Sequence, residues 1–152
     1  MEDMKGMKNG YVSLAVQTAI SGAIMYLVMF VMIDGLGSFY NNLNTLYMTL
    51  MMAAPMTMMV VAMKSMFPSR RANAAIVAAS AIVFFGAFAL IRTQTTIGDK
   101  AFLRSMIPHH SGAILMCEKA KLEDPQVKRL CGEIIKSQRS EIDEMKGILQ
   151  RL

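Results

Sequence analysis

The chain has 152 residues, of which 54% are apolar and 18% charged, with a formal net charge of +5 and a mean hydropathy of +0.38. A positive mean hydropathy argues against an ordinary soluble fold, and without a basic cluster interleaved with aromatics the charge does not indicate nucleic-acid binding. Residues 1–98 carry nine charged side chains, whereas residues 99–152 carry eighteen. We therefore expect a membrane domain over residues 1–98 and a water-exposed domain over residues 99–152.

Three uncharged stretches in the membrane domain are long enough to cross a lipid bilayer. They cover residues 12–33, 43–63 and 72–91. At about 1.5 Å per residue, each can span a hydrocarbon core of roughly 30 Å. One such stretch can be a buried helix of a soluble protein, but three in succession predict three transmembrane helices. The first is too long for the apolar part of a secretion signal, so we expect an uncleaved anchor.

The basic residues in the short joints predict the orientation of these helices, because Lys and Arg resist translocation. Basic residues precede the first stretch and separate the second from the third (Lys5, Lys8, Lys64, Arg70 and Arg71), whereas residues 34–42 contain none. We therefore expect a cytoplasmic N-terminus in the inner membrane of a bacterium. Residues 99–152 should then lie in the periplasm or outside the cell.

Residues 99–152 predict a helical hairpin, in which Asp124 is suited to cap the second helix and Pro125 to occupy its first turn. Candidate seam residues recur at alternating steps of three and four along both helices. They are Phe102, Met106, His109, Ala113, Met116 and Ala120 on the first helix, and Val127, Cys131, Ile134, Gln138, Glu141, Met145, Ile148 and Leu152 on the second. An antiparallel pairing of these positions brings apolar residues together at both ends and polar residues together in the middle.

The polar middle of this seam has two interpretations. His109, Gln138 and Glu141 can satisfy one another in a hydrogen-bonded network that sets the register of the helices. Alternatively, they belong to a metal site, because His110 and three methionines lie close by, namely Met106, Met116 and Met145. Imidazole and thioether together suit copper, with Cu(I) or Ag(I) favoured over zinc. Spacing alone does not decide between the network and the metal site.

Two motifs in this part resemble the domain of unknown function 305 family. They are Met-Ile-Pro-His-His at residues 106–110 and Gln-x-x-Glu-Ile-x-x-Met at residues 138–145. The resemblance covers Asp99 to Leu152, about a third of the chain. It implies a ferritin-like four-helix fold, usually exported, with some members linked to copper or silver binding and metal tolerance. The ligand candidates carried over by position are Met106, His109, His110, Met116, Gln138, Glu141 and Met145.

Many members of this family have four helices and a repeated motif, whereas this chain has one motif and two helices. The seam described above leaves an apolar stripe uncovered, formed by Leu103, Ile107, Ile114, Leu130, Ile135, Ile142 and Leu149. Two helices alone bury too little surface to be stable. We therefore expect an all-α protein in which a homodimer or another even-numbered oligomer completes a four-helix bundle outside the membrane.

The two cysteines, Cys117 and Cys131, lie near the closed end of the predicted hairpin. In an oxidising compartment they can form a disulfide that joins the helices. The alternatives are a reduced thiol pair that binds Cu(I) together with Met116, or two buried free thiols. Position alone leaves these three states open.

Methionine is abundant, with 17 residues in the chain, and fourteen of these precede Gly98. The first two stretches each carry methionines along one face, namely Met25, Met29 and Met32, then Met48, Met52, Met56, Met59, Met63 and Met66. Such faces can pack adaptably between helices and against lipid. Alternatively, they form a thioether track for Cu(I) across the membrane.

No catalytic residues or organic cofactor are expected, because the chain has no nucleophile elbow, phosphate-binding loop, Cys-x-x-Cys pair or haem attachment signature. We expect a membrane-anchored periplasmic protein that binds copper, as Cu(I), or silver in metal homeostasis or tolerance. Its expected partners are the lipid bilayer, further copies of itself and a larger membrane complex, but no nucleic acid. The alternative is an accessory or assembly subunit of a membrane complex whose polar seam is purely structural, and a copper redox enzyme is a third interpretation.

Overall fold

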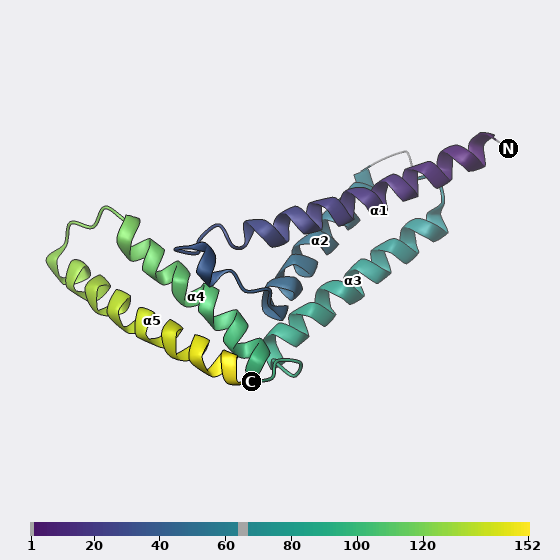
Figure 1. Ribbon diagram of the computed structural model, residues 1–152. Helices are drawn as coiled ribbons and strands as arrows, with labels where there is room; N and C mark the ends of the chain where they lie inside the picture. Colours follow the sequence, from purple (N-terminus) through teal and green to yellow (C-terminus); the bar gives the residue numbers. More distant parts are fainter. Residues whose placement is uncertain (1, 64–66) are drawn as a thin grey trace. The chain divides into compact units, whose positions relative to one another are not determined.

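The computed structural model describes residues 2–63 and 67–152, and in these residues the regular structure is entirely helical (Figure 1). The α-helices are α1 (Glu2–Val28), α2 (Leu43–Met63), α3 (Arg70–Thr93), α4 (Asp99–Lys119) and α5 (Pro125–Arg151), and a short 3-10 helix, η1 (Leu36–Ser38), lies between α1 and α2. The chain divides into two compact units. One contains α1, α3 and α2 from Leu46 onward, and the other contains residues 29–45 and 95–152.

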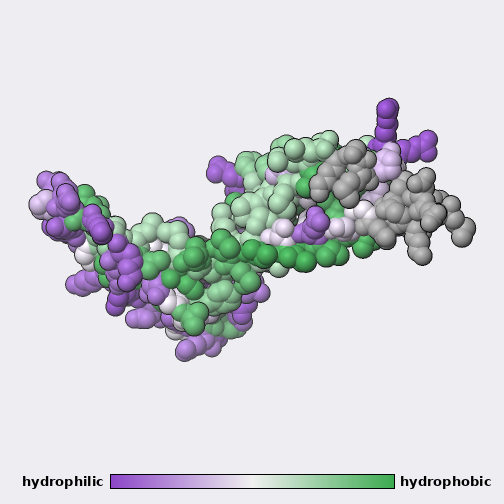
Figure 2. Space-filling view, turned by 90° about the horizontal axis from the view of Figure 1, so that it is seen from above, coloured by the Kyte–Doolittle hydropathy of each residue, from purple (hydrophilic) through white to green (hydrophobic). Residues whose placement is uncertain are grey.

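Three helical segments are long and apolar enough to cross a membrane, which confirms that part of the prediction. They are Gly10–Val28, Leu43–Met63 and Arg70–Thr93. Few residues of these segments are buried in the isolated chain, between 6% and 22% of each. Figure 2 shows hydrophobic side chains along this part, whereas hydrophilic side chains gather on the hairpin of α4 and α5. Apolar helices that expose most of their side chains need lipid or further protein around them.

The first apolar helix is shorter at its C-terminal end than predicted. The sequence predicts a helix to residue 33, but α1 ends at Val28. Phe30 is buried and its ring centroid lies 4.4 Å from that of Phe39, while the N–H of Ile33 donates to the carbonyl of Phe30. These contacts belong to the connection between α1 and α2, so tertiary packing ends the helix although the composition would allow it to continue.

Hydrogen bonds join the helices of the membrane unit. The Tyr11 hydroxyl donates to Asn73 Oδ1 at 2.8 Å, and Asn73 Nδ2 donates to the carbonyl of Phe67 at 2.7 Å. Thr18 of α1 and Thr57 of α2 pair through their hydroxyls at 3.2 Å. In a lipid environment such groups have no water to bond, so pairing them across helices fixes the helices against one another.

The helices α4 and α5 form the predicted antiparallel hairpin, side by side in Figure 1. The predicted cap is confirmed, because the Asp124 carboxylate accepts from the backbone N–H groups of Gln126 and Val127 at 2.7 and 3.0 Å. Pro125 occupies the first turn of α5, where its missing N–H removes no helical hydrogen bond.

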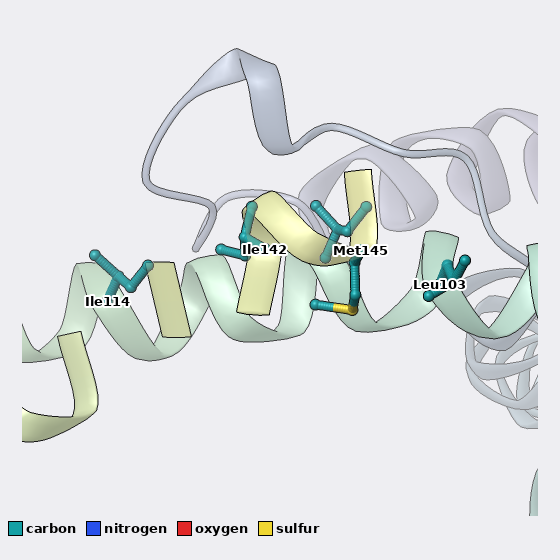
Figure 3. Packing of buried hydrophobic residues seen from close by; sticks show 5 residues of the cluster. Leu103, Ile114, Ile142 and Met145 are labelled. Carbon is teal, nitrogen blue, oxygen red and sulfur yellow. The ribbon is translucent and has the colours of Figure 1, made fainter. Parts of the chain in front are cut away.

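The hairpin core shows that the predicted seam on α4 is wrong by one residue. Leu103, Ile107 and Ile114 of α4 pack with Ile142 and Met145 of α5, and Ile107 and Ile114 are fully buried (Figure 3). The predicted seam residues Phe102 and Met116 are instead 50% and 53% exposed. Both stripes have helical spacing, but the Leu and Ile stripe removes more apolar surface from water, so it is the one that is buried.

Replacing Ile107 with Ala should destabilise the hairpin strongly. Loss of a fully buried Ile side chain typically costs about 2–5 kcal/mol. We expect a clear drop in the thermal unfolding midpoint of the detergent-solubilised protein, measured by differential scanning fluorimetry. Phe102→Ala removes a larger but half-exposed side chain and should lower the midpoint less. The reverse order would mean that the predicted seam, and not the observed one, is the core.

Candidate functional site

The connection between α1 and α2 is held on α4 by Asp34. Its carboxylate accepts hydrogen bonds from the hydroxyls of Ser111 and Ser38, and its backbone N–H donates to the Ser111 oxygen at 2.7 Å. Burial raises the pKa of Asp34, but the hydrogen bonds from Ser111 and Ser38 outweigh this and hold the pKa below its ordinary value of 3.8. Sequence reasoning missed this contact, because Asp34 and Ser111 are 77 residues apart and neither belongs to a recognisable motif.

His110 is buried and has a hydrogen-bond partner at each ring nitrogen. Its Nδ1 lies 3.0 Å from the carbonyl oxygen of Met106, and its Nε2 lies 2.7 Å from Oε2 of Glu141. Because a carbonyl and a carboxylate are both acceptors, a ring protonated at both nitrogens satisfies both contacts. Ser137 donates to the other oxygen of Glu141. The result is a charge-assisted bridge between α4 and α5, of the kind expected for a structural network.

The same contacts shift the titration of Glu141. The hydrogen bond from Ser137, followed by that from His110, holds the pKa of Glu141 below its ordinary value of 4.5, against the smaller effect of desolvation. The Glu141 side chain is 46% exposed, so water screens this interaction in part. The carboxylate therefore supports the hairpin while it is ionised.

His109 points away from this bridge, about 100° around α4 from His110. It is exposed, and within the part of the chain that the structure describes its ring makes no hydrogen bond. Met106 is half-buried one turn before it, and Met116 is exposed two turns after it. We call this set the outer stripe of α4, consisting of Phe102, Met106, His109, Ala113 and Met116. It presents the His109 imidazole and the Met116 thioether at the surface, whereas Met106 also packs against the edge of the hydrophobic core.

The structure separates the sequence-predicted ligands into three groups. Met106, His109 and Met116 lie on the outer stripe. His110 and Glu141 form the bridge inside the hairpin, with Gln138 half-buried one turn before Glu141 on α5. Met145 belongs to the hydrophobic core. Adjacent residues are about 100° apart around a helix, which is why His109 and His110 face different surroundings.

Cys117 and Cys131 form a disulfide between α4 and α5. Their sulfur atoms are 2.10 Å apart and their Cα atoms 5.3 Å apart. In this oxidised state they are not available as a thiol pair for a soft metal. The disulfide closes a loop with a sequence separation of 14 residues and so restrains the end of the hairpin where the chain turns.

Several methionines of the apolar helices are exposed on the surface of the isolated chain. Met29 and Met32 lie beyond the end of α1. The exposed methionines of α2 are Met48, Met52, Met59 and Met63. Met66 and the initiator Met1 lie outside the described residues. This arrangement favours adaptable packing against lipid over a thioether track.

Among the side chains that the structure describes, in residues 10–63 and 67–152, no three of His, Cys, Asp and Glu form a group suited to a metal ion. A centre involving this chain would therefore need methionine sulfur or ligands from a second chain. The outer stripe can supply sulfur and one nitrogen, which is a donor set suited to soft monovalent cations.

Comparisons with known proteins place these residues in a family. The family model of the domain of unknown function DUF305 matches residues 86–151. An uncharacterized protein of Acanthamoeba polyphaga mimivirus, L153, is 39% identical over 119 residues, which cover 76% of each chain. No solved structure matches the chain.

The bridge to His110 makes the hairpin sensitive to acid. A carboxyl group whose pKa is lower in the folded than in the unfolded protein stabilises the fold at pH values above its unfolded-state pKa. This contribution is lost as the pH falls through the folded-state pKa. For Glu141 the loss should therefore begin near its ordinary value of 4.5 and continue below it. We expect the unfolding midpoint to fall over this range and to fall less in Glu141→Gln. Glu144→Gln, a matched change of an exposed residue on the same helix, should keep the wild-type slope.

Proposed function

Since this chain belongs to the DUF305 family, we propose that it is a membrane-anchored protein that binds Cu(I) or Ag(I) through the outer stripe of α4. One observation carries the proposal: His109 and Met116 are exposed on α4 and Met106 lies one turn before His109 at the edge of the core, while His110 is held in a separate bridge. Binding of these cations would serve metal homeostasis or tolerance. No organic cofactor and no catalytic residue are needed for this role.

The chemistry of the outer stripe favours a soft monovalent cation. Met106 and His109 are three residues apart and are therefore neighbours on the helix surface, within reach of one ion. Both donors are neutral, and a thioether with an imidazole suits Cu(I) or Ag(I). Zinc prefers four ligands drawn from thiolate, imidazole and carboxylate, which this face does not supply.

A second copy of the chain can complete the site. Met116 is seven residues beyond His109, about 10 Å along the helix axis, which is too far to share an ion with it in the same chain. If two α4 helices pack antiparallel about the twofold axis of a homodimer, Met116 of one copy lies opposite Met106 of the other. Each of two equivalent sites would then hold two thioethers and one imidazole.

Exposed apolar residues support such a dimer. Phe102 and Met116 on α4, with Val127 and Leu130 on α5, are all more than 40% exposed. Exposed apolar residues of this kind can mark an interaction site. Pairing through them would form a four-helix bundle with an interface different from the one predicted from sequence, because Leu103, Ile107, Ile114 and Ile142 of the predicted stripe are already buried in the hairpin.

The bilayer placement follows from helix length and charge. The three apolar helices would lie in an inner bacterial membrane with the N-terminus in the cytoplasm and the hairpin in the periplasm or outside the cell. The Cys117–Cys131 disulfide supports an oxidising compartment for the hairpin. The predicted orientation rests on basic residues in the joints between helices. Of these, the structure does not describe Lys64 or the side chains of Lys5 and Lys8.

A second candidate function is favoured by the bridge of His110, Glu141 and Ser137. Glu141 contacts His110 through one carboxylate oxygen and accepts from the Ser137 hydroxyl at the other, so both oxygens have partners within the hairpin, as a structural network requires. On this view the chain is an accessory or assembly subunit of a larger membrane complex. The two functions differ in whether His109 binds metal, which a titration decides.

Removing His109 should abolish tight Cu(I) binding. In a competition titration of the purified full chain against a chromophoric Cu(I) chelator, His109→Ala should lose more than the roughly 10- to 100-fold typical of a supporting group. Met106→Leu and Met116→Leu keep side-chain volume but remove sulfur, so each should weaken Cu(I) more than Cu(II). Met145→Leu is the matched control in the core and should bind as wild type does.

The shared site predicts complementation between variants. A chain with Met116→Leu mixed with a chain carrying both Met106→Leu and His109→Ala can form one intact site in each mixed dimer. Mixing should therefore restore tight binding that neither variant has alone. Wild-type affinity in His109→Ala would instead support the accessory-subunit function.

The orientation can be tested with an impermeant maleimide on intact cells. A cysteine in place of Leu36, which is 89% exposed on η1, should be labelled from outside. A cysteine in place of exposed Pro68, between α2 and α3, should be labelled only after lysis. Ser38 is unsuitable as a probe because it is buried and bonded to Asp34. The opposite pattern of labelling would place the hairpin in the cytoplasm.

A further inference from the structure

A hollow of about 330 Å³ lies where the start of α4 meets the start of α2. Its lining residues are Asn41, Asn42, Leu43, Lys100, Ala101 and Arg104. All six belong to the same compact unit, so the hollow does not depend on how the two units are placed. Its volume is at the lower end of the range typical of small-molecule sites.

Two cations line this hollow without an acidic partner. Lys100 and Arg104 are four residues apart on α4, so they extend from the same face of the helix. Both are exposed, and in the described part of the chain neither forms an ion pair. Asp99 lines a neighbouring hollow together with Lys100 and Leu152, but it does not line this one. The hollow itself is lined by two cations and no acidic residue, which points to an anionic ligand.

The opposite wall is a fixed polar surface. Asn42 is 5% exposed and its side chain is held by hydrogen bonds. Its Nδ2 donates to the Tyr40 carbonyl at 3.0 Å, and its Oδ1 accepts from the N–H of Thr45 at 2.8 Å. Asn44 of α2 donates through Nδ2 to the Ser105 hydroxyl of α4 at 3.3 Å, which holds the two helix starts together. This polar surface of the hollow is therefore preformed in the absence of a ligand.

Chain connectivity places the hollow at the membrane boundary. Leu43 is both a lining residue and the first residue of Leu43–Met63, a segment able to cross a membrane. A group bound beside Leu43 therefore lies at the level where hydrocarbon gives way to lipid headgroups. Lys and Arg near that level attract anionic headgroups. Leu43 and Ala101 add apolar surface, which suits a ligand whose phosphate continues into a glycerol and acyl chains.

We propose that this hollow binds the phosphate of an anionic phospholipid, with Lys100 and Arg104 contacting the phosphate and Leu43 contacting the start of the acyl region. A lipid fits better than free phosphate because the lining combines cations with apolar residues at the end of a membrane helix. The proposal rests on the membrane part of the proposed function and is independent of metal binding.

Native mass spectrometry of the full chain in detergent tests the proposal. The protein is given equal amounts of phosphatidylglycerol and phosphatidylcholine with identical acyl chains, and bound lipids are counted. Wild type should prefer phosphatidylglycerol. Lys100→Gln with Arg104→Gln should reduce that preference by about tenfold or more, since each cation near a headgroup contributes to binding. Lys128→Gln with Lys136→Gln removes the same charge from exposed positions on α5 and should keep the preference.

Three outcomes would overturn the proposal. Equal binding of both lipids by wild type would show that the hollow does not select anionic lipid. An equal loss in the α5 control would assign the effect to net charge alone. Displacement of phosphatidylglycerol by an equal concentration of inorganic phosphate would make the hollow a site for a free anion. These three outcomes concern the lipid site alone, and the membrane role stands if the protein requires detergent for extraction. Extraction without detergent would contradict the membrane role itself.

Discussion

The buried face of α4 has to be covered from two directions, because α5 alone leaves part of it open. The connection between α1 and α2 supplies the second cover, with Tyr40 against the hydrophobic core and Asp34 bonded to fully buried Ser111. Asp34 is itself exposed, so its carboxylate remains hydrated while it accepts hydrogen bonds from Ser111 and Ser38. The buried face of α4 is thus covered within one chain. A second copy would therefore have to cover a different face of the hairpin.

Once the Leu and Ile stripe of α4 is turned inward, the neighbouring stripe must turn outward. His110 then meets Glu141 inside the hairpin, and His109 is left on the surface between two methionines. The two histidines therefore have different chemistry although they are adjacent in sequence. His110 is committed to acceptors at both nitrogens, and His109 keeps a nitrogen lone pair for a ligand.

The connection between α1 and α2 joins two membrane helices and also contacts the hairpin through hydrogen bonds. It leaves α1 at Val28, contacts α4 through Asp34, and enters α2 at Leu43 beside the hollow that carries Lys100 and Arg104. The outer stripe and the hollow are separate parts of α4. We infer that one surface handles metal and the other holds the hairpin at the lipid boundary, so each can be altered without the other.

Composition and local pattern were enough to predict the three apolar helices, the two-helix hairpin and the cap at Asp124, because these depend on hydropathy over about 20 residues and on local hydrogen bonding. They could not decide which stripe of α4 is buried, since both stripes have the same helical period. They also could not predict the end of α1, the Asp34–Ser111 contact or the pairing of His110 with Glu141. Those features depend on residues distant in sequence that meet only when the chain has folded, so only the tertiary structure decides them.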